Sequence, residues 1–202
     1  MAAVSQTIVR EYFELHGFLT RQDRKYAARG KREQDGIDFF VWNPKARQRE
    51  APVPFILTAD DLASVQRAIV VVRGWHTEFF GPALLENSPE MFRFVEPAVF
   101  AQAALSFSPD AAPLKILVVP DLAQTAPARE QSIRVLRAKG VDAVIPFRTI
   151  LADLIAHTEV NRNYDKSDLL QIIRVFKNYE FFKGPQMELF RAARRVKRPV
   201  KD

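Results

Sequence analysis

Residues 68–76 read AIVVVRGWH, and this stretch decides the fold. Five consecutive apolar residues followed by a charge and a glycine are typical of a strand that is covered on both faces. Side chains alternate along a strand, so Ile69, Val71 and Arg73 are expected on one face, with Arg73 at the rim. Gly74 is expected to end the strand.

Strands and helices are expected to alternate on both sides of this stretch. The other predicted strands are 18–26, 36–42, 115–119 and 141–147. The predicted helices are 5–16, 58–67, 88–107, 127–139, 148–160 and 167–182. Ser88 is expected to cap the third of these helices, and Pro97 is expected to bend or split it. This order predicts an α/β fold, a mixed central sheet of about five strands flanked by helices, with extra C-terminal helices.

The division into domains follows from where the alternation stops. Residues 1–160 are expected to form the α/β domain, and residues 161–202 a C-terminal helical extension with a basic tail. The chain has 202 residues, a formal net charge of +6 and no cysteine. The lack of cysteine excludes disulfides, thiolate metal sites and cysteine nucleophiles. No basic start with an apolar block and no long apolar run is present, so we expect a cytoplasmic protein that does not contact membranes.

Common catalytic motifs are absent. The sequence contains no glycine-rich phosphate loop, no His-Glu-x-x-His motif and no nucleophile elbow. His16, His76 and His157 are too widely spaced to suggest a metal cluster. What remains is a carboxylate, Asp38, near the start of the strand GIDFFVW and a cation, Arg73, at the end of the central strand.

These two strands carry a resemblance to a known family. GIDFFV at 36–41 and VVVRGW at 70–75 resemble the aspartate strand and the Val-Glu-Val-Lys-Gly-Trp strand of the PD-(D/E)XK nuclease superfamily. The order of elements over roughly residues 5–147 is similar to the restriction-endonuclease-like core of that superfamily. The resemblance implies that Asp38 takes the role of the metal-binding aspartate and Arg73 that of the lysine that helps to activate water.

The same resemblance implies a degenerate active site. The position of the second metal-binding acid falls on Val71, which cannot hold a metal, and arginine is a poor substitute for a lysine that transfers protons. We therefore expect Asp38 and Arg73 to form a structural ion pair across neighbouring strands, with no cofactor. If the protein is active, Asp38 would bind magnesium, with a relocated acid from Glu78, Glu90, Glu11 or Glu14.

Two basic segments make nucleic acid a candidate partner. Six basic residues lie within 21–32, and residues 183–202 carry seven basic against two acidic residues. Such runs are also common on solvated surfaces, so this interpretation stays open. The aromatic side chains at 39, 40, 42, 79 and 80 are expected in the core or on a partner surface rather than under stacked bases. The candidate phosphate contacts are Arg21, Arg24, Lys25, Lys31, Arg32, Arg194, Arg195, Lys197 and Arg198.

Three functions therefore remain open. The first is a catalytically degenerate nuclease-like module that binds DNA, RNA or a partner protein. The second is an active magnesium-dependent endonuclease with a relocated acid. The third is an assembly subunit that forms a homodimer or binds a protein through the C-terminal helices, because the helix 167–182 carries a wide apolar stripe.

Overall fold

The computed structural model describes residues 2–22, 36–47, 52–74, 80–107 and 112–182. The chain divides into two compact units, Met1–Ala156 and His157–Asp202. The first holds the whole sheet, and the second holds the last helix.

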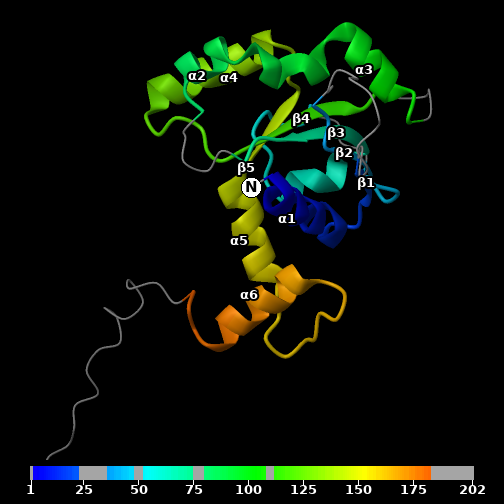
Figure 1. Cartoon of the computed structure of the whole chain (residues 1–202), viewed down its shortest axis with the longest axis vertical. Helices are drawn as coiled ribbons and strands as arrows, with labels where there is room; N and C mark the ends of the chain where they lie inside the picture. The colour runs from blue at the N-terminus through cyan, green and yellow to red at the C-terminus, as the bar shows by residue number, and fades with distance from the viewer. Residues whose placement is uncertain (1, 23–35, 48–51, 75–79, 108–111, 183–202) are drawn as a thin grey trace, which may run out of the picture. The chain divides into compact units, whose positions relative to one another are not determined.

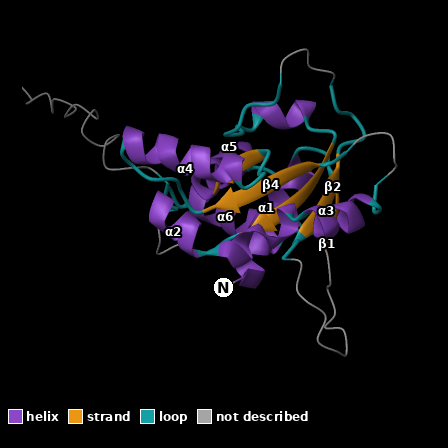
Figure 2. Cartoon of the chain, turned by 90° about the horizontal axis from the view of Figure 1, so that it is seen from above, coloured by secondary structure: helices purple, strands orange, loops and turns teal. Residues whose placement is uncertain are grey.

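A mixed five-stranded sheet forms the centre of the first unit (Figures 1 and 2). Its strands lie in chain order, and the first three pair antiparallel, whereas the last three pair parallel. The α/β class and the mixed sheet are therefore confirmed. The strands are β1 (Leu19–Gln22), β2 (Phe39–Trp42), β3 (Arg67–Val72), β4 (Leu114–Val119) and β5 (Ala143–Pro146).

Helices cover both faces of the sheet. Figure 1 shows α2, α3 and α4 on one side of the sheet and α1 and α5 on the other. The α-helices of this unit are α1 (Ala2–Leu15), α2 (Pro82–Asn87), α3 (Pro97–Ala104), α4 (Ala126–Ala138) and α5 (Phe147–His157). Two 3₁₀ helices, η1 (Asp60–Ser64) and η2 (Pro89–Val95), complete the layers.

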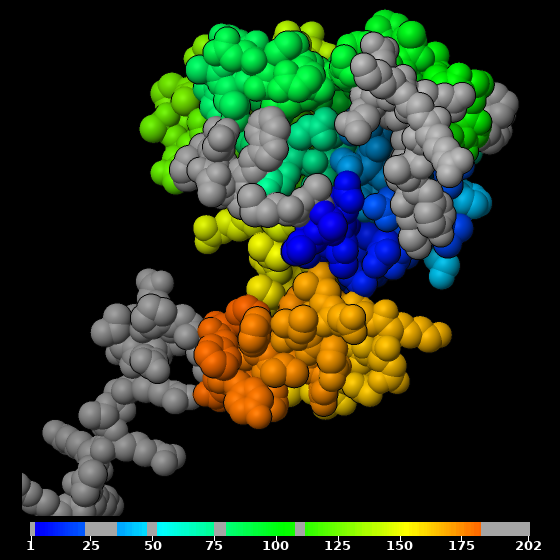
Figure 3. Space-filling view, viewed as in Figure 1, coloured from blue at the N-terminus to red at the C-terminus, as the bar shows by residue number. Residues whose placement is uncertain are grey.

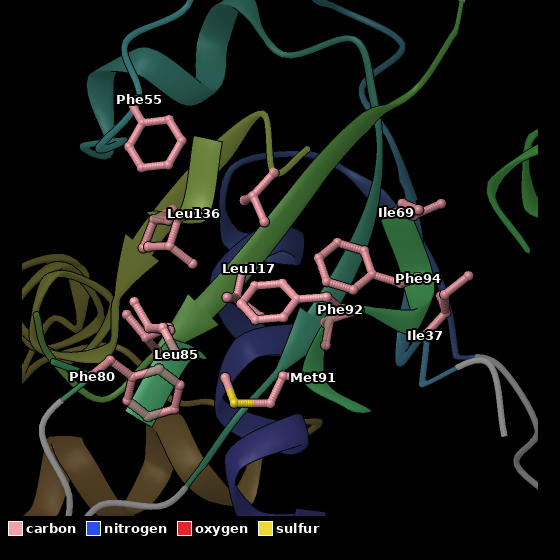
Figure 4. Packing of buried hydrophobic residues seen from close by; sticks show 14 of the residues in the cluster. Ile37, Phe55, Ile69, Phe80, Leu85, Met91, Phe92, Phe94, Leu117 and Leu136 are labelled. Atoms are coloured by element: carbon pink, nitrogen blue, oxygen red, sulfur yellow. The ribbon is translucent and has the colours of Figure 1, made fainter. Parts of the chain in front are cut away.

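Alternation in β3 supplies side chains to both layers. Ile69 and Val71 belong to a core cluster with the residues of η2 and α2, whereas Val70 points to the opposite face. Figure 4 shows Phe92 and Phe94 of η2 next to Leu117 of β4 in this cluster. Every residue of β3 after Arg67 is buried, as the unbroken apolar run predicts.

The outer edge of β5 is also covered. The segment before η1 reaches it, because the N–H of Leu57 donates to the carbonyl of Val144 at 2.9 Å and the N–H of Val144 donates to the carbonyl of Phe55 at 2.7 Å. At the other end of the sheet, no segment pairs with the outer side of β1 within the part of the chain that the structure describes. The two edges of the sheet therefore differ.

The helix predicted at 88–107 differs from the structure in two respects. Pro97 does split it, as expected, but its first part is a 3₁₀ helix, and the side chain of Ser88 makes no capping hydrogen bond. Met91, Phe92 and Phe94 are all buried in this part. In a 3₁₀ helix side chains three residues apart lie one above the other, so Met91 and Phe94 share one line of the helix, and both are buried.

Tyr12 of α1 provides the first testable prediction. Its side chain is fully buried, its hydroxyl has no hydrogen-bond partner among the described residues, and burial raises its pKa above the usual value. We expect Tyr12→Phe to leave the free energy of unfolding unchanged or to raise it by about 1 kcal/mol, because an unsatisfied buried hydroxyl costs about that much. Urea denaturation followed by circular dichroism measures this. A loss of stability in Tyr12→Phe that matches the loss in Tyr12→Leu would contradict it.

The second unit contains α6 (Asp168–Asn178), drawn in orange in Figure 3. The Ser167 hydroxyl caps this helix by accepting the N–H of Leu170 at 3.2 Å. Ile173 is buried, but much of the predicted apolar stripe is not. The exposed apolar side chains of the unit include Val160, Ile172, Val175, Phe176, Tyr179, Phe181 and Phe182.

None of the helices within the described ranges combines the length and the apolar character that crossing a membrane requires.

Candidate functional site

Asp38 lies directly before β2, where the alternation of side chains is interrupted. Ile37 and Phe40 both belong to the cluster around Ile69 and Val71, although residues three apart in a regular strand point to opposite faces. The break therefore falls between Ile37 and Phe40. Because of this break, Asp38 lies on the face of the sheet opposite to the cluster. Helix α1 packs against β3 on that face, and the carboxylate of Asp38 reaches it there.

Both carboxylate oxygens of Asp38 accept hydrogen bonds from the protein. The side-chain amide of Gln6 in α1 donates to Oδ1, and the backbone N–H of Val72 donates to Oδ2 at 2.6 Å. The N–H of Asp38 itself donates to the carbonyl of Val70 at 3.0 Å. The carboxylate thus holds the end of β3 against the start of β2 and against α1, which is a structural task.

Arg73 follows the last residue of β3 and keeps its pairing with β4. Its N–H donates to the carbonyl of Val118 at 2.9 Å. Its Nη1 lies 4.0 Å from Oδ2 of Asp38, and the two side chains are only 17% and 14% exposed. The predicted ion pair is therefore present, at the outer limit of the distance for such a pair. Burial lowers the pKa of Arg73, and the carboxylates of Asp38 and Glu90 act in the opposite direction.

Val71 occupies the position where the resemblance implies a second acid. Its side chain is 0% exposed and belongs to the core cluster, and its neighbour in the parallel register is Leu117 of β4. Apolar side chains surround this position, so it has the character of a core site rather than of an empty metal site.

The proposed relocated acids lie in different places. Glu90 is exposed at the start of η2, and its charge acts on Arg73. Glu14 accepts a hydrogen bond from the Thr20 hydroxyl at 2.7 Å. It follows Gln6 by about two turns of α1, or about 12 Å along the axis at 1.5 Å per residue, and so does not join Asp38. Glu78 lies outside the described residues.

This arrangement favours a structural ion pair over a magnesium site. Magnesium takes six oxygen ligands in near-octahedral geometry, whereas both oxygens of Asp38 are bound to protein donors and a permanent cation lies beside them. Within the described ranges, no three aspartate, glutamate, histidine or cysteine side chains come together in a group that could hold an ion.

Gly36 sits against the guanidinium of Arg73 and gives a second prediction. Its φ is +75°, and a Cβ placed there would lie 3.1 Å from Nη2 of Arg73. We expect Gly36→Ala to lower the free energy of unfolding by about 2 kcal/mol, because it adds backbone strain and displaces the cation.

Gly17→Ala is the matched control for this change. Gly17 has a φ of +79°, and nothing lies within 4 Å of the position that a Cβ would take there, so this change adds only backbone strain of about 1 kcal/mol. Thermal or urea unfolding measures the loss of stability in each variant. The difference between the two losses is the cost of crowding the guanidinium of Arg73. Equal losses would show that the guanidinium moves aside without cost.

Most of the candidate phosphate contacts cannot be placed. Arg24, Lys25, Lys31 and Arg32, and the four residues of the tail, lie outside the described residues. Arg21 is described: it is exposed on β1, with its guanidinium 5.0 Å from the centre of the Phe40 ring. Among the aromatic side chains, Phe39, Phe40 and Phe80 are buried as expected, whereas Trp42 is 44% exposed.

Gln6 is the contact that the sequence did not reveal. A neutral amide on the first helix carries no charge pattern, and its distance in sequence from Asp38 gives no spacing signal. The nearest signal is that Gln6 precedes the apolar positions Val9, Tyr12 and Phe13, which are buried. That stripe directs one side of α1 toward the sheet.

A scan of the chain against family models found no match, and searches of curated proteins and of solved structures found none either. The likeness to PD-(D/E)XK nucleases therefore stays a prediction from sequence, and any function must follow from the geometry of the chain itself.

Proposed function

We propose that this protein is a nucleic-acid-binding module with a nuclease-like fold, in which a structural ion pair occupies the catalytic centre. The single observation that carries the proposal is the state of Asp38. Its carboxylate accepts hydrogen bonds from Gln6 and from the backbone N–H of Val72, and it lies beside Arg73.

Nucleic acid is the partner that the charge distribution supports. The segment 21–32 carries six basic residues and begins in β1, where Arg21 is exposed. The segment 183–202 adds seven basic residues against two acidic ones. Contacts to phosphates need only such charge and reach, and they account for most binding that does not depend on sequence.

The binding test is fluorescence anisotropy with labelled single-stranded and duplex DNA and RNA between about 50 and 200 mM KCl. We expect the logarithm of the affinity to fall linearly with the logarithm of the salt concentration. Replacing both Lys31 and Arg32 by alanine is expected to reduce this slope by about 2, one for each lost phosphate contact. An absence of binding at the lowest salt concentration would overturn the proposal.

Incubation of plasmid and linear DNA with the protein and magnesium or manganese tests the catalytic part. We expect no cleavage. Cleavage that disappears in Asp38→Ala would support the active nuclease with a relocated acid instead, and cleavage that survives in that variant would indicate a contaminating enzyme.

The exposed apolar stripe of α6 favours one other candidate, an assembly subunit. Phe176 lies on this helix and Tyr179 directly follows it, with exposures of 44% and 70%. Exposed aromatic patches of this kind often mark protein contacts. Light scattering at about 100 μM distinguishes the two candidates: a dimer that Phe176→Ser with Tyr179→Ser dissociates would support assembly. A monomer at that concentration would remove self-association.

A further inference from the structure

A pocket of about 380 Å³ lies on the sheet at a distance from Asp38 and Arg73. Leu19 and Arg21 of β1, Phe40 and Trp42 of β2, Arg67 of β3 and Phe107 after α3 contribute to its lining. This volume falls within the range of about 300–1,000 Å³ that is usual for small-ligand sites. It therefore has room for a group of the size of a nucleotide.

The register of the strands explains why these side chains converge. Leu19 pairs with Trp42, and Trp42 pairs with Arg67, so the three form one row across β1, β2 and β3. Arg21 pairs with Phe40 and begins the next row on the same face. Directly opposed side chains lie about 5 Å apart, close enough to form one continuous surface.

This surface combines aromatic rings with cations. Phe40 is almost fully buried and forms the floor, with the ring of Phe107 tilted at 5.9 Å from it. The guanidinium of Arg21 lies over the Phe40 ring at 5.0 Å. Trp42 leaves 44% of its surface exposed, so its ring is accessible to a ligand.

The pocket is separate from the Asp38–Arg73 pair. Trp42 and Arg67 lie at the opposite ends of β2 and β3 from that pair. From residue 38 to 42 the chain extends about 13 Å, and from 67 to 73 about 20 Å, at 3.3 Å per residue. A ligand in the pocket therefore would not touch the ion pair.

We propose that this pocket holds one unpaired nucleobase together with its phosphate. The base would stack on Trp42, and the guanidinium groups of Arg21 and Arg67 would contact the phosphate. None of the lining residues is acidic, and two of them, Arg21 and Arg67, are cations, so the pocket attracts an anionic group. This inference rests on the proposed nucleic-acid function and names the kind of nucleic acid: single strands.

Tryptophan fluorescence provides a direct test. Trp42 and Trp75 are the two tryptophans of the chain, so Trp75→Phe leaves Trp42 as the sole reporter. We expect a saturable quenching of this signal by a single-stranded oligonucleotide and, at higher concentration, by a nucleoside monophosphate. Inorganic phosphate alone and the uncharged nucleoside serve as the two controls for charge and for stacking.

Substitution of Trp42 supplies the second readout. We expect Trp42→Ala to weaken binding of single strands by about 10-fold or more, because stacking of one base contributes that much, while Trp42→Phe loses about 3-fold or less. Binding of duplexes should not change, since their bases are already stacked. The exposure of Trp42 makes unfolding of these variants unexpected, and circular dichroism checks that.

The outcomes separate the two proposals. Binding of single strands that is equal in Trp42→Ala and in the unchanged protein, or no quenching at saturation, would overturn the pocket and leave the proposed function standing. Quenching by the monophosphate without any binding of oligonucleotides would keep the pocket and overturn the proposed function. Equal quenching by nucleoside and monophosphate would indicate a site for an apolar ring, such as a side chain of a peptide, and would overturn the assignment to nucleotides.

Discussion

Val71→Glu is expected to lower the free energy of unfolding by about 4 kcal/mol or more instead of restoring a metal site. The substitution places the acid of the nuclease pattern at the position that the resemblance assigns to it. However, Val71 is 0% exposed within the apolar cluster, and a carboxylate there loses its hydration. Since whole domains are stable by only about 5–15 kcal/mol, a loss of this size leaves the domain marginal or unfolded.

The pH dependence of this variant distinguishes a buried charge from other causes of the loss. Burial raises the pKa of the new carboxyl in the folded state above its unfolded value of about 4.3, so the folded state binds more protons between the two values. Stability therefore falls as the pH rises through this window, and the loss is smaller at about pH 4 than at about pH 7. Urea unfolding at both pH values measures it.

Val71→Leu is the control for size. It adds volume without charge and should cost about 1–3 kcal/mol at either pH. A Val71→Glu protein that is as stable as the unchanged protein and binds manganese would contradict the core assignment of this position.

Asp38→Ala is expected to cost about 3 kcal/mol of stability. The change removes the acceptor for the backbone N–H of Val72 and for the amide of Gln6, and it leaves the guanidinium of Arg73 without its carboxylate. Because the cation lies at 4.0 Å whereas the N–H of Val72 lies at 2.6 Å, most of the loss should come from the hydrogen bonds. Asp38→Asn keeps an oxygen acceptor and should lose less.

A double-mutant cycle with Arg73→Met apportions the two contributions. We expect Arg73→Met alone to lower the free energy of unfolding by about 1 kcal/mol. The loss in the double variant should be smaller than the sum of the two single losses by about 1 kcal/mol. Urea denaturation gives all four values. Strict additivity would mean that the charges at residues 38 and 73 do not stabilise each other.

The strands were predictable from sequence because their signal is local. β3, β4 and β5 are short apolar runs between polar turns, and such runs need burial on both faces whatever the rest of the chain does. The short helix α2 was missed, although Gly81 and Pro82 provide a start signal, because six residues carry too little periodicity. The 3₁₀ form of η2 depends on which of its residues the core accepts, and sequence spacing alone does not contain that information.

The candidate sites divide in the same way. The proximity of Asp38 and Arg73 could be predicted because each lies at the end of a strand, and neighbouring strands bring such ends together. The break in alternation before Phe39, which turns the carboxylate toward Gln6, could not be predicted. The pocket at Trp42 forms because Leu19 pairs with Trp42 and Trp42 pairs with Arg67. This register is a property of the folded sheet, so the pocket could not be predicted from the sequence.

The unequal edges of the sheet limit how copies of the chain could add to one another through backbone hydrogen bonds. Polymerisation into a fibre requires two open edges on each molecule, so that every copy can accept one neighbour on each side. Here the segment 55–57 blocks the edge at β5. Within the described residues, β1 is therefore the edge that is open to addition, and pairing through this one edge favours a closed pair of molecules over a growing cross-β assembly.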